Sequence, residues 1–138
     1  MGLARGYWLL KSEPATYSID DLQRDGKTGW EGVRNFSARL HLRAMRRGDR
    51  AFFYHSSTTP LAVVGECLII RAAYPDPTGP SWTAVGVRFV RKFSRPVTRD
   101  GMKAVRGLAG MKLFGHTRLS VSPVSPAEWR IILRLAGD

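Results

Sequence analysis

The sequence predicts a single α+β domain, spanning residues 1–138, built around a mostly antiparallel and curled sheet. Two observations support this fold class. The chain has 138 residues, of which 43% are hydrophobic, so it is long and apolar enough to bury one real core. The expected order is strand, helix, helix, several strands, a mixed segment and a last helix, with short or irregular links in place of regular crossover helices.

The first half is expected to alternate strands and helices. Residues 7–11 form the first strand, which Pro14 halts. Ser18 is a suitable N-cap for a helix that begins with two aspartates and ends before Gly26. A second helix over about 36–46 is expected because apolar residues recur every four positions, and Gly48 ends it. Residues 51–55 form a short aromatic strand.

The second half contains two more strands and two more helices. Residues 61–70 are nearly all apolar, which predicts a strand buried on both faces. Residues 74–80 are rich in proline and are expected to form a loop before a strand over 82–90. A short helix is expected over 98–105, and glycines leave the segment through His116 unassigned. Ser125, Pro126 and Glu128 predict a capped final helix.

The charge balance indicates a polyanionic partner. Lysine and arginine number 22 against 11 acidic residues, which gives a net charge of +11 and a pI near 10.9. One cysteine, Cys67, excludes an internal disulfide and a cysteine-based zinc site. Polar residues begin by Lys11, too early for a signal peptide, and no apolar run approaches 18 residues. We therefore expect a cytoplasmic monomer that binds nucleic acid and no membrane.

The segment from Trp30 into the second helix carries the strongest functional signal. Trp30 is an isolated aromatic residue in a polar stretch, and Asn35 follows at the start of the helix. An aromatic face, an amide and several guanidinium groups lie within about 18 residues, which suits a site that stacks one base and grips its phosphate backbone. The expected phosphate-binding arginines recur at three- and four-residue steps and are Arg39, Arg43 and Arg46, with Arg50 continuing the row.

The sequence offers little for catalysis or metal binding. His55 and Ser56 are adjacent on an expected strand, so their side chains point to opposite faces and cannot form a hydrolytic pair. The three histidines are far apart and lack metal-ligand spacing. We therefore expect no catalytic residue, no cofactor and no metal. Two alternatives stay open: a nucleic-acid-modifying enzyme or accessory with His55 or Glu13 as the acid–base group, and a general RNA-binding module in translation or RNA processing.

Several segments together resemble the EVE domain, a member of the PUA-like superfamily that is related to the YTH readers of methylated RNA. The matching segments cover nearly the whole chain in order: 7–14, 17–22, 30–35, 38–39, 42–43, 48–49, 54–56, 74–77 and 118–121. The resemblance implies a small β-barrel flanked by helices that reads modified bases in DNA or RNA and has no chemistry of its own. Ser37, Leu40, Gly86 and a short loop after Asp76 depart from the family pattern, which affects the ligand more than the fold.

The resemblance also implies a pocket in which Trp30 is the stacking wall. The residues that it assigns to this modified-base pocket are Lys11, Ser12, Glu13, Trp30, Val33, Arg34, Asn35, Tyr54, His55, Ser56, Arg118, Leu119 and Ser120. A modified base would leave its stack to enter this slot, and Asn35 and Ser12 would read its polar edge. Arg39, Arg43 and Arg46 would hold the flanking phosphates.

Overall fold

A six-stranded sheet organises the protein, and the computed structural model describes it within residues 6–137. The strands are β1 (Tyr7–Ser12), β2 (Lys27–Trp30), β3 (Arg50–His55), β4 (Ala62–Asp76), β5 (Gly79–Thr98) and β6 (Val121–Pro123). The order across the sheet is β2-β5-β4-β3-β1-β6. Only β1 and β3 pair in parallel, and the other neighbours are antiparallel. The predicted α+β class with a mostly antiparallel sheet is thus confirmed.

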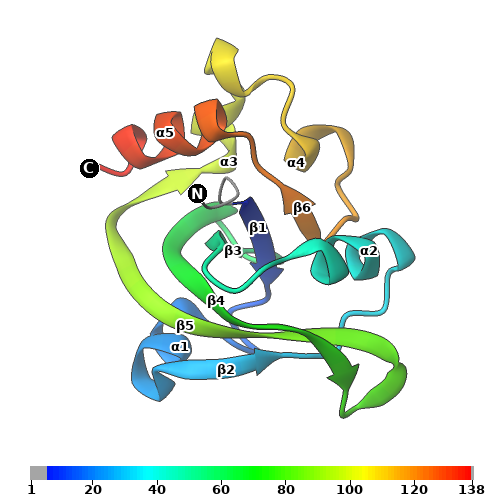
Figure 1. The fold of residues 1–138 in the computed structure, drawn as a ribbon. Coiled ribbons are helices and arrows are strands. Elements are labelled where there is room, and N and C mark those ends of the chain that lie inside the picture. Colours follow the sequence, from blue (N-terminus) through cyan, green and yellow to red (C-terminus); the bar gives the residue numbers. More distant parts are fainter. Residues whose placement is uncertain (1–5, 138) are drawn as a thin grey trace, which may run out of the picture.

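The sheet is curled but does not close into the expected barrel. Figure 1 shows β4 and β5 as long, bent ribbons that wrap around β1 and β3. Their pairing shifts register at several points, and such bulges bend and twist a strand pair. Within the described part of the chain, β2 and β6 form the two edges and do not pair with each other. The sheet is therefore curled and open.

The helices cover both faces of the sheet. They are α1 (Ile19–Asp25), α2 (Phe36–Ala44), α3 (Arg99–Lys103), α4 (Lys112–Gly115) and α5 (Pro126–Leu135), with a 3₁₀ turn η1 (Arg106–Leu108). Successive residues of β1 and β3 point to opposite faces: Leu10 and Phe53 join a core with α1, α2 and β2, whereas Leu9 and Phe52 join a second core with α3 to α5. No helix in residues 6–137 is long and apolar enough to cross a membrane.

The predicted helix caps are confirmed. Ser18 and Ser125 each accept a hydrogen bond from a backbone N–H three residues on, at 3.1 Å, and both form capping boxes. Pro126 occupies the first turn of α5, where its missing N–H costs nothing. The oxygen of each cap satisfies a donor that the helix itself leaves unpaired.

Three boundary predictions were wrong. Residues 74–80 are not a loop, because β4 runs to Asp76 and β5 begins at Gly79, leaving a hairpin turn of two residues. Trp30 does not lie outside regular structure: it ends β2 and pairs with Val85 of β5. Helix α2 ends at Ala44 because Met45 is already extended, so the helix does not reach Arg46.

Candidate nucleic-acid interface

A cavity of about 450 Å³ opens beside Trp30, and we call it the indole cavity. It lies where the end of β1, the link to α1, strand β2 and the link after β2 converge. It brings together seven predicted pocket residues: Lys11, Ser12, Glu13, Trp30, Val33, Arg34 and Ser120. Sequence reasoning missed the remaining lining residues, Thr16, Tyr17, Thr28, Gly29, Glu31 and Gly32, which belong to segments that look like ordinary turns.

Trp30 is both a core residue and a cavity wall. Only 8% of its surface is exposed, and its ring meets Phe53 edge to face with centroids 5.4 Å apart and planes at 87°. Such a T-shaped contact is a favoured aromatic geometry, so the indole is held in one orientation by the core. The residue also lines the indole cavity. The core therefore fixes the orientation of a side chain at the edge of the cavity.

A buried carboxylate fixes the link that follows Trp30. Asp76 is fully buried, and it accepts hydrogen bonds from Gly32 N at 2.7 Å and from Arg34 Nη1 at 3.2 Å. Thr78 donates to its other oxygen from both the backbone and the hydroxyl, at 2.7 and 2.6 Å. Burial alone would raise the pKa of Asp76, but these hydrogen bonds outweigh burial and lower it to about 2. The β4–β5 hairpin therefore anchors one wall of the indole cavity.

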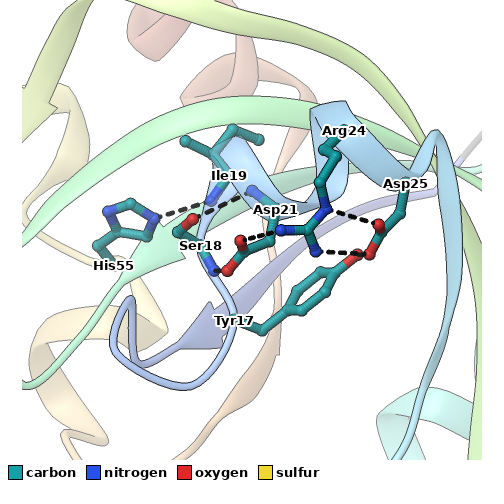
Figure 2. A network of polar contacts seen from close by, with 7 residues as sticks. All are labelled: Tyr17, Ser18, Ile19, Asp21, Arg24, Asp25 and His55. Atoms are coloured by element: carbon teal, nitrogen blue, oxygen red, sulfur yellow. Dashed lines mark hydrogen bonds and ion pairs between the residues drawn. The ribbon is translucent and has the colours of Figure 1, made fainter.

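Figure 2 shows a polar network at α1 that includes Tyr17, a residue of the indole cavity lining. The Tyr17 hydroxyl donates to Asp25 at 2.9 Å, and burial followed by this contact raises the Tyr17 pKa to about 12. His55 accepts a hydrogen bond at Nε2 from the backbone N–H of Ile19, at 3.1 Å, and so helps to cap α1. Burial lowers the pKa of His55, which suits an acceptor. His55 lines none of the cavities described here, so its place in the pocket stays a prediction.

The other predicted pocket residues lie at two adjoining cavities. One, of about 500 Å³, is lined by Lys11, Glu13, Tyr54, Ser56, Arg118 and Ser120 together with Ser57, Leu61, Arg99, Leu113 and Thr117, and we call it the basic cavity. The other, of about 310 Å³, is lined by Asn35, Ser37, His116, Thr117, Arg118 and Leu119. Asn35 does not line the indole cavity, because its side chain caps α2 by accepting from Ala38 N at 2.9 Å. The single predicted pocket is thus a chain of three cavities.

The predicted row of arginines on one helix face is interrupted. Arg39 donates to the backbone oxygen of Ser81 at 3.1 Å, and its guanidinium lies 5.2 Å from the Trp82 ring centre. Arg43 donates to the Thr83 hydroxyl at 3.2 Å, so both residues tie α2 to β5. Arg46 follows the helix end, and Arg50 belongs to β3, where it pairs with the buried Glu66. The arginines stay periodic in the sequence past the end of α2, so the spacing suggested a longer helix face than the structure has.

The comparisons with known proteins place the chain in a family. Residues 6–135 match the model of the EVE domain. The chain belongs to the EVE domain family. Thymocyte nuclear protein 1 of rat is 39% identical to it over 94% of this chain and 73% of the relative. Among the described residues, no group of three histidine, cysteine, aspartate or glutamate side chains is placed to hold a metal ion.

Solved structures agree with this assignment. A hypothetical protein from Leishmania major is 40% identical, with a TM-score of 0.93 and coverage of 96% of this chain and 95% of that one. Human THYN1, solved in complex with DNA containing 5-methylcytosine, is 33% identical with a TM-score of 0.90, over 96% and 98% of the two chains. A YTH domain from Zygosaccharomyces rouxii is 14% identical with a TM-score of 0.59, over 96% and 86%, and shares the fold.

Proposed function

We propose that this EVE domain is a non-catalytic reader of modified bases in DNA or RNA, and that the base enters the indole cavity. The observation that carries the proposal is the rigid face of Trp30 in the wall of an open cavity of about 450 Å³. Cavities of roughly 300–1,000 Å³ are typical of small-ligand sites. Human THYN1 was solved in complex with DNA containing 5-methylcytosine, which supports the same class of ligand for the present chain.

The lining of the indole cavity also supplies polar groups for the edge of the base. Ser12 uses its hydroxyl hydrogen on the backbone oxygen of Tyr17, so its hydroxyl oxygen remains as an acceptor. The Glu13 side chain is exposed at the cavity and offers a carboxylate to an exocyclic amino group, the donor that cytosine and adenine present. These acceptors favour a base with an amino group over one without it.

The cationic surface adds affinity that does not depend on sequence. Arg39, Arg43 and Arg46 remain our candidates for phosphates that flank the base, although Arg39 and Arg43 are partly engaged by β5. Neutralising about three phosphates would give a log–log salt slope near −2 to −3. We further propose that the protein acts as a single cytoplasmic monomer, where the buried thiol of Cys67 stays reduced; burial raises its pKa to about 12.

The test compares matched modified and unmodified oligonucleotides at fixed salt, by fluorescence anisotropy of a labelled strand. We expect tighter binding of the modified strand and a loss of this preference in Trp30→Phe, which shrinks the stacking face but keeps an aromatic ring against Phe53. Base stacking contributes about 1–3 kcal/mol, which corresponds to about 5- to 150-fold in affinity.

Trp129→Phe is the matched control, because Trp129 belongs to the second core and stacks on Phe52 at 3.8 Å. It removes the same atoms from the interior without touching the indole cavity. Thermal melts verify that both variants fold. Equal affinity of the wild type for both strands, unchanged by Trp30→Phe, would exclude the reader function.

A further inference from the structure

We propose that the basic cavity binds the backbone phosphate next to the base that occupies the indole cavity. This inference rests on the proposed reader function and names a second subsite of the same interface. The two cavities share Lys11, Glu13 and Ser120 in their linings, so they meet along one wall. A base in the first cavity therefore brings its own sugar–phosphate chain to the mouth of the second.

Three cations from three different segments converge on the basic cavity. Lys11 comes from β1, Arg99 from the start of α3, and Arg118 from the link between α4 and β6. Aromatic faces position two of them: Lys11 Nζ lies 5.9 Å from the Tyr54 ring centre, and the Arg99 guanidinium lies 5.3 Å from that of Phe114. The charges of Lys11 and Arg99 are thus positioned by contacts within the fold.

No acid within residues 6–137 neutralises these cations by an ion pair. Lys11 Nζ donates to the backbone oxygen of Thr117 at 3.0 Å, which leaves its charge uncompensated. Glu13 is the only carboxylate in the described lining, and Asp100 lines a separate cavity beside residues 57–61. Burial, and then the charge of Arg99, lower the pKa of Lys11, as expected where cations gather without a counter-ion.

The charge and size of the basic cavity suit a single phosphate group. Three cations against one carboxylate leave about two net positive charges in a half-enclosed space, which favours a compact anion with several acceptor oxygens. Ser56 and Ser120 add hydroxyl donors in the same lining. Arg118 is distant from Trp30 in the sequence, but it lines the basic cavity, which adjoins the indole cavity.

The test uses a modified oligonucleotide in which one methylphosphonate, a neutral linkage, replaces the phosphate on the 5′ or the 3′ side of the modified base. We expect one of these two strands to bind the wild type about tenfold more weakly than the natural strand. Arg99→Gln and Arg118→Gln should each weaken the natural strand to a similar degree and lower the salt slope by about one. The neutral linkage should then weaken Arg118→Gln by a smaller factor than it weakens the wild type, because Lys11 and Arg99 still face the linkage.

Arg130→Gln is the matched control, because Arg130 is exposed on α5 and lines neither cavity. The inference is overturned if both methylphosphonate strands bind like the natural strand, a result that requires no protein variant. It is also overturned if Arg99→Gln and Arg118→Gln behave like Arg130→Gln. Failure of the reader function is distinct: the wild type would then not separate modified from unmodified strands, whatever the linkage.

Discussion

The carboxylate of Asp76 accepts a 2.7 Å hydrogen bond from the backbone N–H of Gly32, a residue 44 positions earlier in the chain. Gly32 has a φ of 83°, in the left-handed region that glycine adopts without strain. This contact joins the tip of the longest hairpin to the segment between β2 and α2. The wall of the indole cavity that carries Arg34 is therefore set by a residue that does not line that cavity.

Replacing Asp76 with asparagine should loosen this wall. The amide places an N–H group against donors from Gly32, Arg34 or Thr78 and removes the charge that strengthens their hydrogen bonds. We expect the free energy of unfolding to fall by about 2–3 kcal/mol, measured by urea denaturation. Asp100→Asn, at an exposed position, is the control and should change stability little. Equal stability of the two variants would contradict the anchoring role.

The same carboxylate should produce an acid-dependent loss of stability. Its pKa is about 2 in the folded protein against an ordinary value of 3.8, so its stabilising contribution is complete above about pH 4. The contribution is lost as the pH falls from about 4 towards 2, because the unfolded chain takes up the proton more readily. We expect the stability difference between wild type and Asp76→Asn to shrink over this range, measured by thermal melts. A constant difference would contradict the assignment.

His55 should behave as a helix cap with a pH dependence. Burial lowers its folded pKa below 6.5, so the neutral acceptor at Ile19 N stabilises the fold fully above about pH 6.5 and less as the pH falls further. We expect His55→Ala to lose about 1 kcal/mol of stability at pH 7.5, in the range of other helix caps.

His55→Gln separates capping from catalysis, because it keeps an acceptor and cannot titrate. We expect it to be more stable than His55→Ala at pH 7.5. Between pH 7 and 5.5 it should lose less stability than the wild type does, measured by chemical denaturation. Oligonucleotide affinity at pH 7.5 should be unchanged. Loss of a reaction product in both variants would instead support the enzymatic alternative.

Arg43 should contribute affinity without specificity. Its contact with Thr83 holds it on the surface between α2 and β5, outside the cavity that reads the base. We expect Arg43→Gln to weaken modified and unmodified strands by the same factor and to lower the salt slope by about one, measured by anisotropy across a salt series. A change in the modified-to-unmodified ratio would show that Arg43 takes part in reading the base.

Incubation of the protein with modified DNA and RNA should leave their masses unchanged, measured by mass spectrometry of the recovered nucleosides. Glu13 is the remaining acid–base candidate at the interface, since His55 is engaged by α1. A new product that disappears in Glu13→Gln would overturn the non-catalytic proposal. The same variant tests reading of an amino group, because an amide replaces the pure acceptor of the carboxylate.

Local signals in the sequence predicted the features that depend on neighbouring residues. The caps at Ser18 and Ser125 follow from a hydroxyl placed three residues before an acid, and the aromatic strand predicted over 51–55 lies within β3, which is buried on both faces. Trp30 was singled out correctly as a cavity residue although its setting was mistaken: its polar neighbours suggested a loop, whereas they belong to an edge strand that pairs only on one side.

What the sequence could not supply depends on contacts between distant segments. Asn35 caps α2 and His55 accepts a hydrogen bond from α1, and neither contact follows from the family resemblance. The basic cavity needs Lys11, Arg99 and Arg118 to meet, and no spacing along the chain reveals that. Arg39 and Arg43 were read from periodicity alone, which cannot show that β5 would engage them.

Because the Trp30 ring makes a T-shaped contact with Phe53, the residue proposed to meet the ligand is also part of the core. Substitutions of Trp30 should disturb folding and recognition together. Thr16 and Glu31 also line the cavity but are exposed and lie outside the core. A change of base preference should therefore be sought by keeping Trp30 and substituting the polar lining residues Thr16 and Glu31.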